Sequence, residues 1–222
     1  MDKAEVNPDI KYIAIEGVIG VGKTTLAKKI RNRLNAEIIL EEFDANPFLE
    51  KFYSDRNRFA FQTQMFFLIN RFKQQEELNQ EELFVEYTVA DYLFEKDRIF
   101  AYLNLSSEEL KLYESIYPLL ARSLRKPDLV VFLQSSTDRL MHNIKSRNRK
   151  IERALNRSYI EKLSEAYNHF FFRYNNTPLL IVNSTDIDFV NSEDDFDELF
   201  KQIFRGDRGV KEYFKPETKN TE

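Results

Sequence analysis

The residue types best suited to chemistry lie in a glycine-rich segment near the N-terminus. It matches the pattern G-x-x-x-x-G-K-[ST] over Gly17, Val18, Ile19, Gly20, Val21, Gly22, Lys23, Thr24 and Thr25. Glycines let a backbone curl until its N–H groups converge on phosphate oxygens. Lys23 can then reach the β- and γ-phosphates, and the Thr24 hydroxyl can bind Mg²⁺. The segment predicts a site for ATP, or another nucleoside triphosphate, with Mg²⁺.

The surroundings of this segment argue against a chance match. Residues 12–16 are β-branched and aromatic and predict a buried strand, and residues 26–34 have the apolar spacing of a helix. A phosphate-binding loop requires this order, because the helix that follows the loop presents its positive N-terminus to the phosphates.

Carboxylates follow two of the predicted strands. Glu41 and Glu42 follow the strand at residues 38–40, and Asp91 follows the strand at residues 83–90. Ligands of parallel α/β sheets bind at the carboxyl ends of the strands. One carboxylate could support Mg²⁺ and its waters, and another could take the proton of an attacking hydroxyl. Solvated acids without a function are an equally good interpretation of position alone.

A long predicted helix at residues 58–77 carries two further polar candidates. Gln64 and Arg71 are seven residues apart, so they share one helix face at the edge of an apolar stripe. The amide of Gln64 offers two donors and an acceptor, which suit the edge of a nucleobase. A core glutamine bonded to the backbone fits this pattern equally well.

A basic cluster follows the predicted fourth strand. It comprises Lys145, Arg147, Arg149, Lys150 and Arg153. On an ideal helix Arg147 and Arg149 would point about 200° apart, so both reach one phosphate group only if the segment unwinds or bends. The alternative is a solvated basic face.

The elements that must position these residues alternate between strands and helices. The predicted strands are residues 12–16, 38–40, 83–90, 129–133 and 179–182. The predicted helices are residues 26–34, 46–53, 58–77, 106–125, a helix from 137, 158–173 and 189–204. Such alternation predicts a three-layer α/β fold, with a five-stranded parallel sheet flanked by helices. We expect one domain over residues 1–222, with mobile ends at residues 1–9 and 207–222.

Composition excludes several classes of protein. The 222 residues include no Cys and two His, which excludes disulfides, thiol catalysis, and cysteine or multi-histidine metal sites. The 33 Lys and Arg against 37 Asp and Glu give a net charge of −4, so no general attraction to nucleic acid or anionic membrane is expected. The charged N-terminus lacks a signal peptide, and no apolar run is long enough to cross a bilayer. We expect a cytoplasmic protein without a nucleic-acid or membrane partner.

Together these residues resemble the deoxyribonucleoside kinases, especially the bacterial deoxyadenosine/deoxyguanosine kinase branch. The resemblance covers residues 11–204 and includes the segment EEFDANPFLEKFY at residues 41–53. It implies a P-loop NTPase-type fold with a short basic lid, and usually a homodimer. It also implies transfer of the γ-phosphoryl group of ATP to the 5′-hydroxyl of a deoxynucleoside, in nucleotide salvage. The expected acceptor is a purine deoxynucleoside, with deoxyadenosine favoured.

The resemblance also implies roles on the acceptor side of the site. Glu41 would be the base for the 5′-hydroxyl, and Tyr53 would bind the sugar 3′-hydroxyl. Gln64 and Arg71 would read the base, and Phe100 would stack on it.

On the donor side, Arg147 and Arg149 resemble the lid arginines that bind the triphosphate. Glu152 matches a lid acid that binds the 3′-hydroxyl, and Asp188 and Phe189 resemble the loop around the donor adenine. The alternative for Glu152 is a surface ion pair with a neighbouring lid cation.

Two positions depart from the family pattern near the metal site, where Thr24 and Asp91 would support Mg²⁺. Glu42 stands where family members often have Pro, so Glu42 competes with Glu41 for the role of base. Tyr92 stands where most members have Arg, which removes a cation that faces the phosphates.

Three other functions fit parts of the pattern. A nucleoside monophosphate kinase of the thymidylate type would bring a charged acceptor to Glu41 and Glu42, at a cost of several kcal/mol in a partly dehydrated site. A deoxynucleoside kinase of broad or pyrimidine specificity shares every motif. A P-loop regulatory protein would bind the triphosphate alone, and the residues for the sugar and base disfavour it.

Overall fold

The computed structural model describes residues 6–81 and 85–216, and within them a six-stranded parallel sheet has the order β2-β3-β1-β4-β5-β6. The strands are β1 Tyr12–Gly17, β2 Glu37–Ile39, β3 Thr88–Ala90, β4 Leu129–Gln134, β5 Leu179–Asn183 and β6 Lys211–Phe214. The helices are α1 Lys23–Leu34, α2 Leu49–Ser54, α3 Arg56–Glu81, α4 Lys96–Asn104, α5 Ser107–Ala121, α6 Thr137–Arg147, α7 Arg157–Arg173 and α8 Glu193–Phe204. Two 3₁₀ turns are η2 Phe43–Ala45 and η3 Lys150–Glu152.

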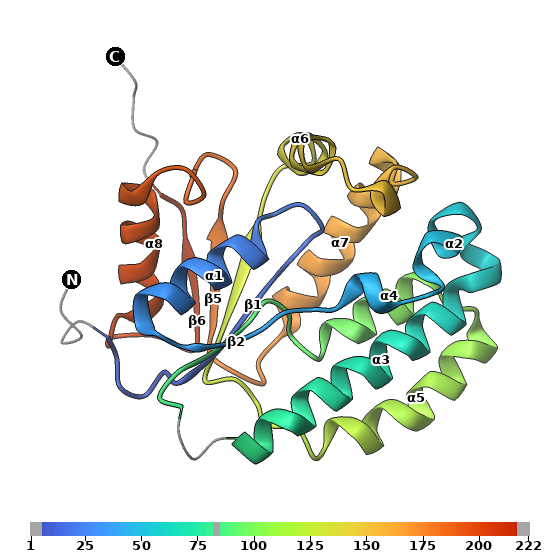
Figure 1. Cartoon of the computed structure of the whole chain (residues 1–222), viewed down its shortest axis with the longest axis horizontal. Coiled ribbons are helices and arrows are strands. Elements are labelled where there is room, and N and C mark those ends of the chain that lie inside the picture. The colour runs from blue at the N-terminus through green and yellow to red at the C-terminus, as the bar shows by residue number, and fades with distance from the viewer. Residues whose placement is uncertain (1–5, 82–84, 217–222) are drawn as a thin grey trace.

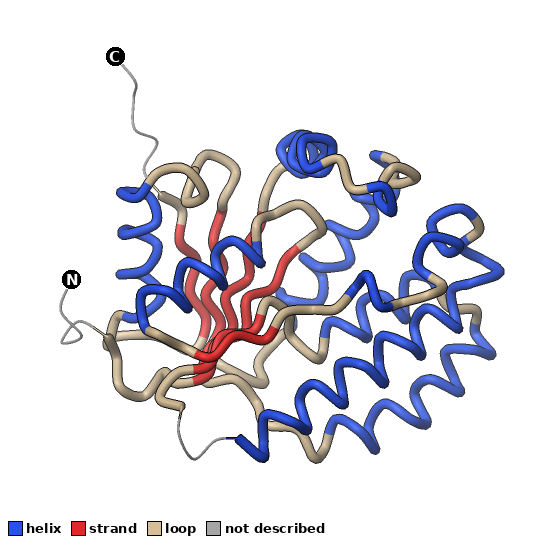
Figure 2. Tube along the Cα trace, viewed as in Figure 1, coloured by secondary structure: helices blue, strands red, loops and turns tan. Residues whose placement is uncertain are grey.

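Helices cover both faces of the sheet, as the sequence predicts (Figures 1 and 2). On one face α1 and α8 pack together, where Lys29 and Arg33 of α1 lie over the Phe196 ring of α8. On the other face α7 covers β4, with the Phe132 and Phe171 rings stacked at 4.1 Å between centroids. The central strands β1 and β4 are apolar and buried because both faces of a parallel sheet are covered.

The sheet has six strands where the sequence predicts five. The additional strand, β6, pairs in parallel with β5 at the edge of the sheet, and Lys211 lies opposite Leu179. It lies within residues 207–222, so the expectation of a mobile tail is wrong for residues 211–214. Its side chains alternate between exposed and half-buried. This strand has four residues, two charged ones followed by two aromatic ones, so it shows no alternation of apolar and polar residues, which explains why it was not predicted.

Some element boundaries also differ from the predicted ones. The third strand is confined to Thr88–Ala90, and part of the predicted range, residues 83 and 84, lies outside the described residues. Residues 46–53 do not form one helix but follow η2 and enter α2 at Leu49. Helix α4 was not predicted, and it places Lys96 and Asp97 close to the end of β3.

The glycine-rich segment joins β1 to α1 as predicted. Gly20 and Gly22 have φ values of 92° and 104°, which residues with a Cβ rarely adopt. A Cβ on Gly20 would lie 2.9 Å from the Leu140 carbonyl oxygen, and one on Gly22 would lie 2.9 Å from the Phe189 ring. Both the backbone conformation and the close packing therefore require glycine at these positions.

No helix within residues 6–81 and 85–216 has both the length and the apolar character of a membrane span. The cytoplasmic location stays a prediction. Residues 1–5 and 217–222, where the mobile ends were expected, lie outside the described residues.

Candidate active site

Thirteen of the predicted site residues line one cavity of about 120 Å³ at the carboxyl edge of the sheet. They are Ile19, Gly20, Lys23, Thr24, Glu41, Tyr53, Gln64, Arg71, Asp91, Phe100, Arg147, Arg149 and Glu152. They come from the loop after β1, from α1, the ends of β2 and β3, helices α2, α3, α4 and α6, and the segment after α6. The fold therefore brings together residues that are more than a hundred positions apart in the sequence.

The phosphate end of the cavity is formed by the loop between β1 and α1. The Lys23 ammonium folds back over this loop and donates a hydrogen bond of 2.7 Å to the Gly17 carbonyl oxygen. Burial lowers the pKa of Lys23, and the neighbouring carboxylate of Glu16 acts in the opposite direction. Because the backbone N–H groups and the start of α1 face the same region, an anion of high charge would be bound there.

Thr24 and Asp91 lie together beside this loop. The Thr24 hydroxyl donates a 2.5 Å hydrogen bond to Asp91 Oδ2, while Asp91 Oδ1 accepts one of 2.7 Å from the Glu41 backbone N–H. A hydroxyl and a carboxylate are hard oxygen ligands. Mg²⁺ commonly binds to one or two such groups together with substrate phosphates and water. The residues therefore fit the predicted Mg²⁺ site.

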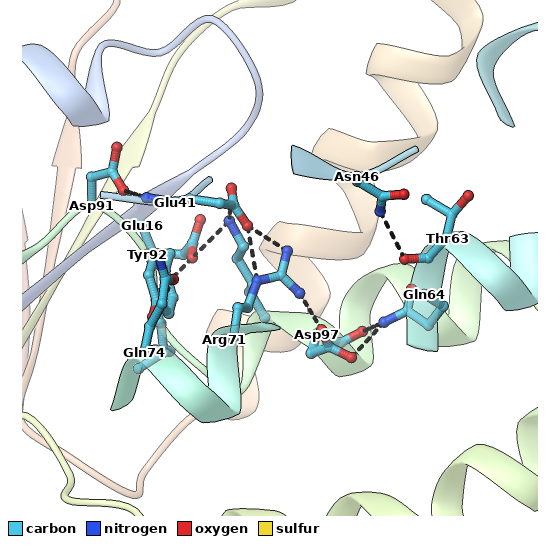
Figure 3. A network of polar contacts seen from close by, with 12 residues as sticks. Glu16, Glu41, Asn46, Thr63, Gln64, Arg71, Gln74, Asp91, Tyr92 and Asp97 are labelled. Carbon is cyan, nitrogen blue, oxygen red and sulfur yellow. Dashed lines mark hydrogen bonds and ion pairs between the residues drawn. The ribbon is translucent and has the colours of Figure 1, made fainter. Parts of the chain in front are cut away.

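Glu41 is held by two cations, one on each carboxylate oxygen, and Figure 3 shows one of them, Arg71. Arg71 Nε donates to Oε1 at 2.8 Å, and Lys96 Nζ donates to Oε2 at 2.8 Å. Burial would raise the pKa of Glu41, but Lys96 and Arg71 outweigh it and hold that pKa well below the ordinary value. Glu41 is therefore ionised and fixed in orientation.

Glu42 is placed differently from its neighbour. Its side chain is exposed and lies at the start of η2, and it does not line the cavity. Of the two adjacent acids, only Glu41 is therefore placed for a role beside the phosphate loop.

The guanidinium of Arg71 links Glu41 to a second buried carboxylate, Asp97 (Figure 3). Arg71 and Asp97 are 4% and 0% exposed, so the pair is shielded from water. Asp97 also accepts hydrogen bonds from the Tyr113 hydroxyl at 2.9 Å and from Gln64 Nε2 at 2.5 Å. Asp97 and its three partners, Arg71, Gln64 and Tyr113, thus fix one wall of the cavity.

Gln64 combines the two interpretations that its sequence position allowed. Its Nε2 donates 2.9 Å to the Asp97 backbone carbonyl, as a core glutamine would, and yet the side chain lines the cavity. No group within the described residues donates to its Oε1. The amide oxygen is therefore available to a ligand.

The segment after α6 unwinds where the two lid arginines require it. Helix α6 ends at Arg147, and Asn148 follows with φ 45°, so Arg149 is not helical and both arginines reach the cavity. Arg147 forms a bidentate pair with Glu152, with contacts of 2.8 and 2.6 Å. The ion pair with a lid cation is thus present, but Glu152 is buried and lines the cavity, so it is not the surface pair that the alternative described.

The remaining predicted residues occupy two regions. Tyr53 and Phe100 line the cavity, and burial raises the pKa of the Tyr53 phenol well above its ordinary value. Phe189 is buried outside the cavity, against Gly22 of the phosphate loop. Asp188 lies beside it and accepts hydrogen bonds from Asn191.

Sequence reasoning missed three charged residues of the site. Lys96 and Asp97 begin α4, and from the sequence alone two adjacent charged residues at the start of a helix are expected to be exposed to solvent. Glu16 is the buried residue before Gly17, and its carboxylate accepts from the backbone N–H groups of Gly17 and Leu93. The one available signal was their position, because all three lie at or just beyond the carboxyl ends of β1 and β3.

Comparisons with known proteins agree with this geometry. The profile of the family described as deoxynucleoside kinase matches residues 13–206. The chain is similar to deoxyguanosine kinase of Bacillus subtilis (strain 168), with 36% identity over 86% of this chain and 95% of the relative. It is 31% identical to the deoxyadenosine/deoxycytidine kinase of the same organism, over 88% of this chain and 93% of that relative.

A solved structure shows the same fold. It is deoxyadenosine kinase from M. mycoides with the products dCMP and dCDP bound, which has a TM-score of 0.76 and 26% identity. The alignment covers 86% of this chain and 97% of that one.

The buried guanidinium generates a prediction about stability. Arg71→Met leaves two carboxylates without their shared cation, and we expect it to lower the free energy of unfolding by about 3–5 kcal/mol. The double variant Arg71→Met/Asp97→Asn should lose less, because one of the two charges is gone.

Urea unfolding of both variants measures this effect. Arg122→Met, which removes an exposed arginine near the end of α5, is the matched control and should change stability by no more than about 0.5 kcal/mol. A loss in Arg71→Met no greater than in this control contradicts the interpretation.

Proposed function

The chain belongs to the deoxynucleoside kinase family, and from this premise we propose that it phosphorylates the 5′-hydroxyl of a purine deoxynucleoside, with ATP as donor and deoxyadenosine as the preferred acceptor. One observation carries the proposal: an ionised, oriented carboxylate, Glu41, lies in the same cavity as the phosphate-loop lysine, Lys23. An acceptor hydroxyl held between these two groups would meet a base on one side and the γ-phosphoryl group on the other. The product, a deoxynucleoside 5′-monophosphate, makes this a salvage reaction.

The base preference rests on Gln64. Because Asp97 accepts from its Nε2, the amide is oriented with Oε1 free for the ligand. An acceptor on the protein suits the exocyclic amino group of adenine, whereas guanine presents a carbonyl oxygen at that position. Phe100 would supply a face for the base to stack on.

In the proposed reaction Glu41 accepts the proton of the 5′-hydroxyl as that oxygen bonds to the γ-phosphorus. Phosphoryl transfer passes through a loose transition state, so positioning and charge matter more than base strength. This explains how a carboxylate whose pKa is lowered by Lys96 and Arg71 can serve, since it stays ionised and fixed in direction.

The phosphate groups would be bound by Lys23, the loop N–H groups, Arg147 and Arg149. Thr24 and Asp91 would hold Mg²⁺, which when bound neutralises charge on the β- and γ-phosphates. Arg147 is paired with Glu152 in this structure, so binding of the triphosphate would require it to share or leave that carboxylate.

The sugar and the donor base complete the proposal. Tyr53 and Glu152 line the cavity, and we assign them to the sugar 3′-hydroxyl, the phenol and the carboxylate each forming a hydrogen bond. The Phe189 ring lies against Gly22 of the phosphate loop, and we assign Phe189 and the adjacent Asp188 to the donor adenine.

The family excludes two of the earlier alternatives. The relatives are kinases of deoxynucleosides rather than of monophosphates, and a regulatory P-loop protein needs neither Glu41 in the cavity nor the wall built on Asp97. A broad acceptor range is consistent with the deoxyadenosine/deoxycytidine kinase among the relatives.

We assign a homodimer through the outer faces of α3 and α5. Ile69 of α3 is 45% exposed, and Leu112 and Leu119 of α5 are 51% and 59% exposed. Leu112 and Leu119 are two helical turns apart on the same face, and exposed apolar groups clustered in this way are typical of interfaces. The resemblance to the family also implies a second copy of the chain as the partner.

The acceptor is tested by kcat/KM of the wild-type chain, with ATP and Mg²⁺, on the four natural deoxynucleosides and on thymidine 5′-monophosphate. We expect deoxyadenosine to give the highest value and the monophosphate to be inert. A preference for thymidine or deoxyguanosine, whose bases present a carbonyl oxygen where adenine has its amino group, contradicts the assignment of Gln64. Turnover of the monophosphate alone contradicts the proposed reaction.

The same assay tests the sugar contacts. A 2′,3′-dideoxynucleoside leaves Tyr53 and Glu152 unpaired, at about 1–3 kcal/mol, so it should be about tenfold or more poorer than the 2′-deoxynucleoside. Glu152→Ala should remove most of that difference by slowing the normal acceptor. Equal discrimination in the two proteins would show that Glu152 serves only its ion pair with Arg147.

The base is tested by Glu41→Gln, with Glu42→Gln as the matched control. Loss of a general base typically lowers kcat about 10²–10⁴-fold, and the affinity for the nucleoside should change little because the amide keeps the side-chain shape. Glu42→Gln should retain wild-type turnover. The opposite result, with Glu42→Gln inactive and Glu41→Gln active, assigns the role to the other acid.

The dimer is tested by analytical ultracentrifugation. Leu112→Glu/Leu119→Glu should sediment as a monomer at concentrations where the wild type is a dimer, because two buried charges would have no partners. Val210→Glu, at an exposed apolar residue just before β6, is the control and should not change the mass. A wild-type monomer, or a dimer that survives the double substitution, contradicts the assigned face.

A further inference from the structure

Lys96 is a buried cation for which the roles assigned above give no chemical task. It begins α4, it is 2% exposed, and it lines the same cavity as Lys23, Thr24 and Asp91. Its ammonium lies 2.8 Å from Glu41 Oε2 and 3.9 Å from Glu16 Oε2. Glu16 is in turn bonded to the Gly17 N–H, so the ammonium lies between the base and the start of the phosphate loop.

The ammonium retains unused hydrogen-bonding capacity. A lysine offers three N–H donors, and within the described residues Lys96 donates to Glu41 alone. Buried donors without a partner are costly, so a group next to a cavity is expected to find its acceptors on the ligand or on water. The ligand atoms expected beside Glu41 Oε2 are the acceptor 5′-oxygen and the oxygens of the transferred phosphoryl group.

The neighbouring Tyr92 cannot supply this charge. It is fully buried, its hydroxyl donates a 3.1 Å hydrogen bond to Gln74, and it does not line the cavity. Its ring lies 5.8 Å from the Lys96 ammonium and forms part of the ammonium's surroundings. The position at which the family resemblance leads one to expect a cation therefore carries none. Lys96, four residues further on at the start of α4, brings a cation to the cavity instead.

We propose that Lys96 is a further catalytic residue. Its ammonium contacts Glu41, and also the acceptor 5′-oxygen and the oxygens of the transferred γ-phosphoryl group. In the transfer, the 5′-oxygen forms a bond to the γ-phosphorus. The bond from that phosphorus to the β–γ bridging oxygen breaks, with its electron pair going to ADP. The hydroxyl proton passes to Glu41. Lys96 keeps its protons throughout and stabilises the negative charge on the transferred group. The proposal rests on the proposed function.

The competing interpretation is structural. In it Lys96 is only the counter-ion of Glu41 and Glu16, and it acts through Glu41 or through stability alone. The two interpretations differ once Glu41 has been neutralised. A counter-ion then keeps only its 3.9 Å pair with Glu16, which affects stability, whereas a cation on the phosphoryl group still affects kcat.

The experiment measures kcat and KM for deoxyadenosine with Lys96→Met in two backgrounds, wild type and Glu41→Gln. We expect Lys96→Met to lower kcat about 10²–10³-fold, as loss of one transition-state donor does, with a much smaller change in KM. We expect a further clear loss of kcat in the Glu41→Gln background as well. Lys96→Arg, which keeps the charge, should recover a large part of the activity.

Two controls make the result decisive. Lys162→Met removes an exposed lysine of α7 and should keep wild-type kcat. Thermal unfolding reports on folding. If Lys96→Met alone is unfolded, the double variant Glu41→Gln/Lys96→Met, which loses one charge of each sign, is compared with Glu41→Gln.

Two results would overturn the proposal: wild-type kcat in a folded Lys96→Met variant, or no additional loss in the Glu41→Gln background. Both require an active wild type. An inactive wild-type chain would instead overturn the proposed function, so the two failures are distinguishable.

Discussion

The interaction on which the site depends is the buried guanidinium of Arg71 between Glu41 and Asp97. A buried charge requires opposite charges at contact distance. The Arg71 guanidinium therefore requires the two carboxylates, and each carboxylate requires the guanidinium. Through this ion the end of β2, the middle of α3 and the start of α4 are held in one arrangement. The same ion fixes the direction of the Glu41 carboxylate and, through Asp97, the orientation of the Gln64 amide. One cation therefore positions both the proposed base, Glu41, and the amide proposed to recognise the nucleobase, Gln64.

The topology of the sheet explains why these groups meet. Strands β3 and β1 are neighbours, and β2 lies beside β3, so the ends that carry Glu16, Glu41 and Asp91 lie along one edge. The phosphate loop follows β1 at that same edge. Helix α1 presents its N-terminus there, and α3 and α4 pack against each other to one side of the sheet (Figure 1). A surplus of negative charge at this edge is balanced by Arg71 and Lys96 on the acceptor side and by Lys23 on the donor side.

Much of this arrangement could be predicted from local sequence. The phosphate loop is a backbone conformation encoded by its own glycines, and the seven-residue spacing places Gln64 and Arg71 on one face of a helix whatever surrounds it. Lys96 could not be found in this way. Its partner, Glu41, is 55 residues away, and only the fold shows that a charged helix start is buried. Strand β6 was missed for a related reason: its pairing with β5 is a tertiary contact, and its two charged and two aromatic residues do not alternate. Arg147 and Arg149 lie between these cases. Their spacing in the sequence showed that the helix must unwind for both to reach one phosphate group, but it did not show that the helix ends just before Asn148.

The central claim is that this buried charge network presents Glu41 to the acceptor hydroxyl at the phosphate loop. A crystal structure of the chain with deoxyadenosine and a non-hydrolysable ATP analogue tests it most directly. We predict that the 5′-oxygen lies within about 2.6–3.2 Å of a Glu41 carboxylate oxygen, in line with the γ-phosphorus, while Arg71 still bridges Glu41 and Asp97. A 5′-oxygen bound to Glu42 or to no carboxylate, or an Arg71 that has left Glu41 to bind the ligand, would contradict it.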